Sequence, residues 1–396
     1  MNYTIGMVGP ITLLDFREFL DSRLDFDALP KGLGGSPVNL LSRELLKRGH
    51  RMIIFTVDRS VRDEVIVMGE RLKICVGPDR PKHARDFFSK ERKYLVRAIQ
   101  REKPDVLHAQ WTYEFALAAI ASGVPYVVTA HDAPINVLRR NFIPYRIART
   151  VMAYVALWRA KRVVSVSPYV AKHLRRFAFH WRHIQVVPNG LSQELFDQRI
   201  SNRKQHREIT FATVLNGWAG YKNGQVAIQA FALLRKQFGS ARLLMFGQDH
   251  GAGEIADRWS REKQLEQGIE FVGHLPHDQL INRLRTDVDV LVHPSLEESH
   301  GMALIEAMAL GIPVIGGVTS GAVPWTLDQG KAGILVDMKS PKKLAEVMLK
   351  LARDPTGRET WGATGSASVQ ERFHVRAIAD QYETCYEQAL SGVRSG

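Results

Sequence analysis

Cysteine is scarce in this 396-residue sequence, which contains only Cys75 and Cys385. Two cysteines are too few for a disulfide framework, and no metal-binding spacing of cysteine and histidine accompanies them. No run approaches about eighteen uninterrupted apolar residues, so no membrane-spanning helix is predicted. The first residues, MNYTIGMVGP, lack the basic and apolar regions of a signal peptide and are expected to begin a strand. These absences favour a reducing compartment, and we expect the protein in the cytoplasm.

Acidic residues are missing from one long stretch. Residues 133–190 contain eleven lysines and arginines and no aspartate or glutamate. Residues 1–190 hold 31 basic and 17 acidic residues, whereas residues 191–396 hold 23 and 24, so nearly all of the net charge of +13 lies in the first half. This asymmetry indicates that the first half of the chain meets an anionic partner.

Aromatic residues are interleaved with the basic ones. Residues 141–162 are expected to form a long amphipathic helix, and a second basic helix is expected from Ser167 to Phe179. Such a mixture suits the headgroup layer of an anionic membrane, where each basic residue contributes about 1 kcal/mol. A solvated basic face is the alternative, and nucleic-acid binding is not expected because no recognised module is present. The residues concerned are Arg139, Arg140, Tyr145, Arg146, Arg149, Tyr154, Trp158, Arg159, Lys161, Arg162, Arg175, Arg176, Phe177, Phe179, Trp181 and Arg182.

Strand-like and helix-like segments alternate through both halves of the chain. Residues 3–8, 38–47 and 52–57 are expected to form a strand, a helix and a strand. A polar linker at residues 191–208 precedes a second series of the same kind, which begins at residues 209–214. This alternation predicts an α/β protein with parallel sheets in two halves.

The most informative stretch is residues 293–317, which are expected to follow a buried strand as a loop, a helix and another strand. In such a unit the loop and the helix start lie at the carboxyl edge of the sheet. The backbone N–H groups of Gly301 and Met302 would have no partner within the helix and could receive an anion. Glu298 and Glu306 flank that position, and carboxylates suit the hydroxyl donors of a sugar. A surface glutamate beside an ordinary helix is the alternative.

This stretch resembles the signature of retaining glycosyltransferase family 4. Seven residues separate Glu298 from Glu306, a glycine precedes the helix, and Glu-Ala-Met-Ala begins at Glu306. The resemblance implies the GT-B fold, in which two Rossmann-like domains face one another across a cleft. The domains would be residues 1–190 and 191–370, and residues 371–396 would form a helix that returns to the first domain.

Two further sites in the first half fit this resemblance. Gly34 and Gly35 precede the first helix, where the family has a glycine pair near the donor diphosphate or the acceptor. A flexible turn is the alternative, and the spacing does not match a dinucleotide fingerprint. His131 follows a strand that ends in Val-Val-Thr-Ala, and the histidine at this place in the family contacts the transferred sugar. A histidine that caps the strand end is the alternative.

The second half supplies the remaining implied contacts. Lys222 lies between a strand and a helix, where its charge would neutralise a diphosphate leaving group. The family usually has an arginine before this lysine, but that position falls on Asn216 or Gly217 here. Gly247 matches the family's next turn at the ligand edge, and the backbone of Leu275 would contact the nucleotide base.

The resemblance therefore implies a retaining hexosyltransferase in the synthesis of a cell-surface polysaccharide or glycolipid. The donor would be a UDP- or GDP-sugar, and the acceptor would be a glycan or lipid-linked. His131, Lys222 and Glu298 would be catalytic, and the substrate would be bound by Gly34, Gly35, Gly217, Gly247, Leu275, Gly301, Met302 and Glu306. No covalent glycosyl-enzyme is expected, because the family is associated with front-face attack. We expect no cofactor and no metal ion, since no Asp-x-Asp motif ends a strand. Peripheral contact with the inner face of the plasma membrane is expected through the basic first half.

Two other readings of the sequence are open. A nucleotide-sugar epimerase shares the fold but lacks the context of Glu298 and Glu306. A catalytically inactive protein that binds nucleotide-sugars or membranes would explain why the arginine before Lys222 is absent.

Overall fold

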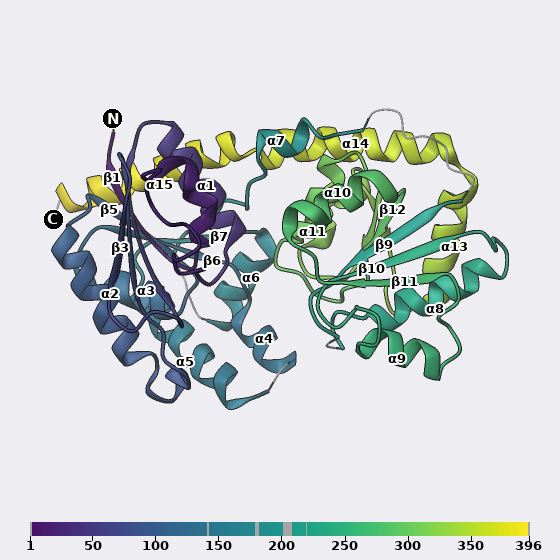
Figure 1. Ribbon diagram of the computed structural model, residues 1–396, viewed down its shortest axis with the longest axis horizontal. Coiled ribbons are helices and arrows are strands. Elements are labelled where there is room, and N and C mark those ends of the chain that lie inside the picture. Colours follow the sequence, from purple (N-terminus) through teal and green to yellow (C-terminus); the bar gives the residue numbers. More distant parts are fainter. Residues whose placement is uncertain (1, 141, 179–181, 201–207, 219, 395–396) are drawn as a thin grey trace. The chain divides into compact units, whose positions relative to one another are not determined.

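A computed structural model describes residues 2–140, 142–178, 182–200, 208–218 and 220–394. The chain divides into two compact units. Unit 1 comprises Met1–Gly190 together with Val375–Gly396, and unit 2 comprises Leu191–His374. Each unit is a sheet with helices on both faces (Figure 1). The expectation of an α/β protein with two sheets is confirmed.

Unit 1 contains an eight-stranded sheet in the order β3-β4-β2-β1-β5-β6-β7-β8. All neighbours are parallel except β3, which runs antiparallel to β4 at the edge. The inner strands are buried beyond their first residues because helices cover both of their faces, as is usual for parallel sheets. The strands are β1 (Thr4–Val8), β2 (Arg51–Asp58), β3 (Val65–Met68), β4 (Leu72–Pro78), β5 (Val106–Gln110), β6 (Tyr126–Ala130), β7 (Val163–Ser165) and β8 (Ile184–Val186).

The helices of unit 1 form two layers. One face of the sheet packs against α1 and α15, and the other packs against α2, α3, α5 and α6. Tyr382 and Tyr386 of α15 are buried in the first of these layers. The helices are α1 (Ser36–Lys47), α2 (Ser89–Glu102), α3 (Glu114–Ser122), α4 (Pro134–Arg140), α5 (Pro144–Arg159), α6 (Pro168–Phe177) and α15 (Val375–Arg394), with short 3-10 turns at Leu13–Phe19 and His83–Asp86.

Unit 2 contains a six-stranded parallel sheet in the order β11-β10-β9-β12-β13-β14. Its strands are β9 (Thr210–Val214), β10 (Arg242–Phe246), β11 (Ile269–Gly273), β12 (Val290–Val292), β13 (Val314–Gly317) and β14 (Ile334–Val336). Its helices are α7 (Gln193–Phe196), α8 (Gly224–Arg235), α9 (Ile255–Glu262), α10 (His277–Asp287), α11 (Met302–Ala309), α12 (Val323–Thr326), α13 (Pro341–Arg353) and α14 (Pro355–Phe373), with a 3-10 turn at Asp328–Gly330. One face carries α10, α11 and α14, and the other carries α8 and α13.

Some segments differ from the sequence prediction. The long helix expected over residues 141–162 is shorter, because Pro144 occupies the first turn of α5 and α4 is a separate helix before it. The final helix begins at Val375, since His374 has an extended backbone that separates α14 from α15. Part of the expected linker forms α7, and residues 201–207 lie outside the described residues, as do Phe179 and Trp181.

Candidate active site

Each sheet has one place where the strand order reverses. The reversal lies between β1 and β5 in unit 1, and between β9 and β12 in unit 2. In open parallel sheets, ligands bind outside the carboxyl ends of the strands at such a reversal. The loops that leave β9 and β12 carry Lys222 and Glu298, and the loop that leaves β1 carries Gly34 and Gly35.

Lys222 and Glu298 form an ion pair at the reversal in unit 2. The Nζ atom of Lys222 lies 2.8 Å from Oε1 of Glu298, and both side chains are more than four-fifths buried. The same oxygen accepts a second hydrogen bond from Nε2 of His293, which lies 3.1 Å away. The structure therefore brings together two residues that the sequence analysis had assigned to separate tasks, the diphosphate and the sugar.

Glu298 is held as a carboxylate. Burial alone would raise its pKa, but the hydrogen bond from His293 and the charge of Lys222 together lower the pKa below its ordinary value. His293 had no role in the sequence analysis. The signal that could have found it is its position as the first residue beyond β12, at the carboxyl end of a central strand.

The start of α11 lies just after Glu298 in the chain. Gly301 has a left-handed backbone at the N-cap and offers no side chain to cap the helix. Because the first N–H groups of a helix have no partner inside it, those that follow Gly301 are available to an anion. Glu306, one turn after Met302, accepts a hydrogen bond of 3.1 Å from Nε2 of His277, the first residue of α10. Among the described residues, no hydrogen bond joins Glu306 to Glu298.

Asn223 ties the two central loops of unit 2 together. It precedes α8, and its Nδ2 donates to the carbonyl oxygens of Pro294 (3.1 Å) and Met338 (2.7 Å). The first of these bonds fixes the loop of Lys222 against the loop of Glu298. The sequence analysis missed this residue, because an asparagine before a helix is ordinarily a cap and reveals nothing about distant partners.

The other predicted residues of unit 2 lie at the same edge of the sheet. Gly217 lies in the loop after β9, and Gly247 follows β10 directly. Gly247 has φ +112°, and a Cβ atom there would lie 1.8 Å from the carbonyl oxygen of Leu215, so only glycine fits. Leu275 is half-buried two residues beyond β11.

The glycine pair of unit 1 lies at the carboxyl end of β1. Gly35 is the N-cap of α1 with φ +119°, and a Cβ atom there would lie 2.4 Å from the carbonyl oxygen of Pro10. Gly34 has nothing within 4 Å of its own Cβ position, so space is open beside it. The backbone N–H of Gly32 donates to Oδ2 of Asp58 at the end of β2 (2.6 Å), which holds this loop at the edge of the sheet.

His131 lies just beyond β6 and is oriented by Gln110. Nε2 of His131 lies 2.6 Å from Oε1 of Gln110, and its ring packs 4.4 Å from the ring of Trp111. The amide nitrogen of Gln110 lies 3.1 Å from Nε2 of His108, whose Nδ1 reaches the hydroxyl of Tyr386 at 2.8 Å. A buried polar chain thus runs from His131 to helix α15. Gln110, which had no role in the sequence analysis, is the last residue of β5.

His131 and His108, the two histidines in this series of hydrogen bonds, are neutral. Burial lowers the pKa of His131 to about 4 and that of His108 to about 3. A neutral His131 that donates Nε2–H to the carbonyl oxygen of Gln110 leaves Nδ1 unprotonated. His131 can therefore accept a hydrogen bond from a hydroxyl group through Nδ1.

These shifts predict how the stability of unit 1 depends on pH. Histidine in the unfolded chain has a pKa of about 6.5, so the stabilisation by neutral His131 is fully present above that pH. It is lost as the pH falls toward 4, by on the order of 3 kcal/mol for His131. Urea denaturation between pH 7 and pH 4.5 should therefore show a smaller loss for His131→Asn than for the wild type. An equal loss in both proteins would contradict the prediction.

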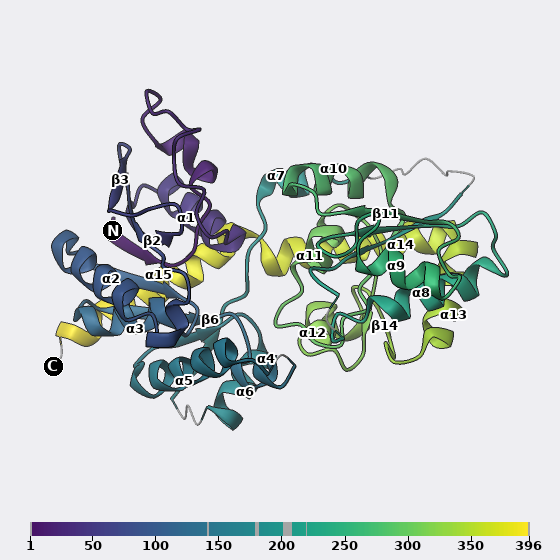
Figure 2. The same ribbon diagram turned by 60° about the horizontal axis from the view of Figure 1, so that its bottom comes forward.

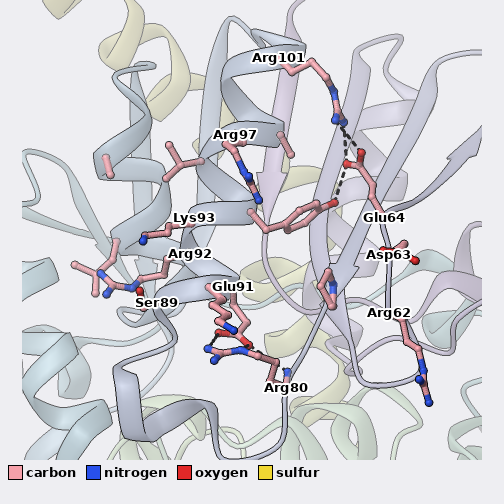
Figure 3. A pocket seen from close by; sticks show the side chains of 17 residues that line it. Arg62, Asp63, Glu64, Arg80, Ser89, Glu91, Arg92, Lys93, Arg97 and Arg101 are labelled. Carbon is pink, nitrogen blue, oxygen red and sulfur yellow. Dashed lines mark hydrogen bonds and ion pairs between the residues drawn. The ribbon is translucent and has the colours of Figure 1, made fainter.

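A cavity of about 980 Å³ lies along α2, away from these residues. Lys93, Arg97 and Arg101 follow one another on one side of the helix, and Arg101 is held by Glu64 at 2.8 Å (Figure 3). Among the described residues, neither Lys93 nor Arg97 forms an ion pair. Seven basic and three acidic residues line this cavity, so its charge suits an anion. It contains none of the residues predicted to bind a donor.

A group with metal-ligating atoms lies beside this cavity. Asp79, His83 and Glu91 are buried, and one ligand atom of each lies within 4.8 Å of the others. Arg80 binds both carboxylate oxygens of Glu91, and Nδ1 of His83 contacts Asp79. The potential metal-ligating atoms of these three residues thus already have hydrogen-bond or ion-pair partners within the protein.

Two protein-family models match the chain. Residues 194–367 match the model described as glycosyl transferases group 1, and residues 38–195 match the model described as glycosyltransferase family 4. The N-acetyl-alpha-D-glucosaminyl L-malate synthase of Bacillus anthracis is 24% identical over 318 residues, which are 76% of this chain and 79% of that protein.

Solved structures show the same fold over nearly the whole length. Sucrose-phosphate synthase from Thermosynechococcus elongatus superposes with a TM-score of 0.77 at 20% identity, covering 99% of this chain and 100% of that chain. Anabaena HepE in complex with UDP-glucose gives a TM-score of 0.69 at 16% identity, covering 98% and 100%. The prediction of a GT-B fold is confirmed. Since the two family models together span residues 38–367, the chain belongs to glycosyltransferase family 4 and is a glycosyltransferase.

Proposed function

We propose that this protein transfers a sugar, with retention at the anomeric carbon, from a UDP- or GDP-sugar to a glycan or lipid-linked acceptor. The observation that carries the proposal is the buried pair of Lys222 and Glu298 at the strand reversal of unit 2. A cation fixed at that edge is suited to a departing diphosphate, and UDP is supported because HepE, a structural neighbour, was solved with UDP-glucose.

The donor would be held by the loops of unit 2. The N–H groups of Gly301 and Met302 would receive the diphosphate, and Lys222 would neutralise its charge as the bond to the sugar breaks. Glu306 would accept hydrogen bonds from the ribose hydroxyls. The backbone of Leu275 would contact the base, and the absence of side chains at Gly217 and Gly247 would let the nucleotide approach the backbone.

Glu298 is suited to binding the sugar and poorly suited to attacking it. Its Oε1 already accepts from both Lys222 and His293, which lowers the basicity of the carboxylate. A covalent glycosyl-enzyme is therefore not part of the proposal. The acceptor would attack on the face that the diphosphate leaves, and a phosphate oxygen of the leaving group would take the acceptor proton.

His131 would accept a hydrogen bond from a sugar hydroxyl through Nδ1. Gln110 is then a positioning residue, because its carbonyl oxygen fixes which ring nitrogen carries the proton. Gly34 and Gly35 would leave room for the acceptor or the diphosphate at the edge of β1.

Replacing Gln110 with Leu should lower kcat about tenfold, with little change in the KM for the donor. One hydrogen bond of this kind contributes about 1 to 1.5 kcal/mol, which corresponds to that factor. Gln110→Glu keeps an acceptor oxygen and should retain more activity than Gln110→Leu. Steady-state kinetics of the two variants measures the difference, and equal losses in both would argue against orientation of His131 by Gln110.

The distribution of charge supports an anionic acceptor. Unit 1 carries the basic surplus, and the relative from Bacillus anthracis is named for L-malate, an anionic acceptor. We propose that the acceptor is an acidic glycan or is lipid-linked, and that the reaction serves the synthesis of a cell-surface polysaccharide or glycolipid at the inner face of the plasma membrane. Along the described residues, no helix has both the length and the apolar composition needed to cross a bilayer.

The test is release of nucleoside diphosphate from a panel of UDP-, GDP- and ADP-sugars, with product stereochemistry followed by NMR. One donor should be turned over, and the anomeric configuration of the donor should be kept in the product. If a donor binds but is not turned over in the presence of any of the lipid or acidic acceptors tested, the alternative of a catalytically inactive binding protein would be favoured.

A further inference from the structure

Helix α5 exposes an apolar face to solvent. Six large apolar residues on it and just before it are exposed, with Trp158 82% exposed and Phe142 74% exposed. They recur at spacings of three and four residues along the helix, so they form one stripe. We call this stripe the α5 ridge; its members are Phe142, Ile143, Ile147, Val151, Val155 and Trp158.

The α5 ridge is separate from the side by which α5 joins the protein. Met152, Ala153, Ala156 and Leu157 are buried and belong to the core of unit 1. A surface helix ordinarily carries polar residues opposite its buried side, whereas α5 is apolar on both. A contiguous exposed apolar patch of this kind marks an interaction surface.

Positive charge surrounds the ridge. Arg139 and Arg140 precede α5, Arg159 is its last residue, and Lys161 follows it; all four are exposed. No acidic residue occurs between positions 133 and 190. Arg149, which the sequence analysis counted with this basic face, is instead buried against the ring of Tyr113 at 3.8 Å and belongs to the interior.

The positive charge continues into the cavity along α2. Burial lowers the pKa of Arg92; Asp86 opposes this effect, and the charge of Arg159 adds to it, so Arg159 acts electrostatically on Arg92. Arg92 lines the cavity that also holds Lys93 and Arg97 (Figure 3). The α5 ridge is thus bordered by basic side chains that attract anions. No acidic residue lies in the same stretch of sequence, residues 133–190.

We propose that the α5 ridge lies in the interfacial layer of a membrane that contains anionic lipid. An apolar stripe flanked by arginine and lysine is the pattern of a helix that lies in the plane of the surface. At 16 residues α5 is too short to span a bilayer, which needs about twenty apolar residues. A second copy of the chain is a poorer occupant, because two such faces would bring like charges together.

This inference rests on the proposed function and deepens it by naming where the acceptor comes from. His131 and α5 are joined only by the short helix α4, and α4 and α5 pack side by side (Figure 2). A lipid-linked acceptor held in the same surface as the ridge would then reach the carboxyl edge of β6. A soluble acceptor would not need the ridge.

The experiment is co-sedimentation of the full-length protein with vesicles. Vesicles of phosphatidylcholine alone are compared with vesicles of phosphatidylcholine and phosphatidylglycerol in equal amounts. The wild type should bind the anionic vesicles at least about tenfold more tightly than the neutral ones. Val151→Asp and Trp158→Ser should each weaken that binding about tenfold.

The matched control is Ile255→Asp. Ile255 is 41% exposed on helix α9 of unit 2, close to the 47% of Val151, and should bind vesicles as the wild type does. Equal binding of the wild type to both kinds of vesicle would overturn the inference. So would a wild-type dimer in analytical ultracentrifugation that Val151→Asp converts to a monomer without changing vesicle binding.

Failure of this inference can be told from failure of the proposed function. Vesicle binding is measured without donor, and hydrolysis of the nucleotide-sugar is measured without vesicles. Val151→Asp should keep the wild-type rate of donor hydrolysis, since Val151 touches no proposed donor residue, while losing transfer to a lipid-linked acceptor in vesicles. Loss of donor hydrolysis in Val151→Asp would contradict the inference that the α5 ridge acts only in membrane binding.

Discussion

Replacing Lys222 with Met should lower kcat for nucleotide-sugar turnover by about a hundredfold to a thousandfold. Removing one fixed group that stabilises developing charge has an effect of that size. Lys222 is already held in place at 2.8 Å from Glu298, so its charge is positioned before the donor arrives. Among the described residues, no other lysine or arginine forms an ion pair with Glu298, so no second fixed charge is suited to replace that of Lys222. Steady-state release of nucleoside diphosphate measures the effect.

Two variants control this measurement. Lys222→Arg keeps the charge and should recover part of the activity. Recovery should be incomplete, because the planar guanidinium group of arginine cannot reproduce a contact made by the single ammonium nitrogen of lysine. Lys236→Met removes an exposed lysine just beyond α8 and should leave kcat unchanged. If Lys222→Met kept the wild-type kcat, the charge would not act on the leaving group.

Replacing Glu298 with Gln should destabilise unit 2 as well as abolish most of the activity. The variant leaves the largely buried ammonium of Lys222 without a counter-charge, and breaking such a pair costs several kcal/mol when fully buried, so about 2 kcal/mol is expected here. The pKa of the Glu298 carboxyl is lowered in the folded protein, so this stabilisation is present above the unfolded pKa and is lost as the pH falls toward the folded one. Urea denaturation at neutral pH measures the free energy of unfolding.

A double-mutant cycle separates stability from chemistry. Lys222→Met combined with Glu298→Gln removes both charges and should restore much of the stability lost in Glu298→Gln alone. It should not restore turnover, because the group proposed to act on the diphosphate is still absent. Recovery of activity in the double variant would mean that the pair has only a structural role.

Much of the architecture followed from patterns within single elements. Buried strands such as β2 and β10 are near-continuous apolar runs, and proline and glycine mark the ends of the helices between them. Short or polar elements were harder to predict. Helix α9 has few apolar residues, and β3 is a four-residue edge strand, so neither has a strong periodic signal.

The candidate site was predictable one loop at a time. The sequence pointed to Lys222 and Glu298 separately, because each follows a central strand. Their mutual contact depends on how β9 and β12 neighbour one another, which is a property of the sheet and not of either segment. The same holds for His131 and Gln110, which are brought together by the pairing of β5 with β6.

The return of the chain to unit 1 decides which pieces of this protein could be made alone. A fragment that stops at Gly190 lacks α15, so the apolar residues that pack on Tyr382 and Tyr386 would face water, and Nδ1 of His108 would lose its bond to Tyr386. Unit 2 is one unbroken stretch, Leu191–His374, that keeps its own sheet and both of its helical layers. The second fragment is therefore the one to express for donor titrations by NMR, and the first would have to be joined to the last helix by an engineered linker.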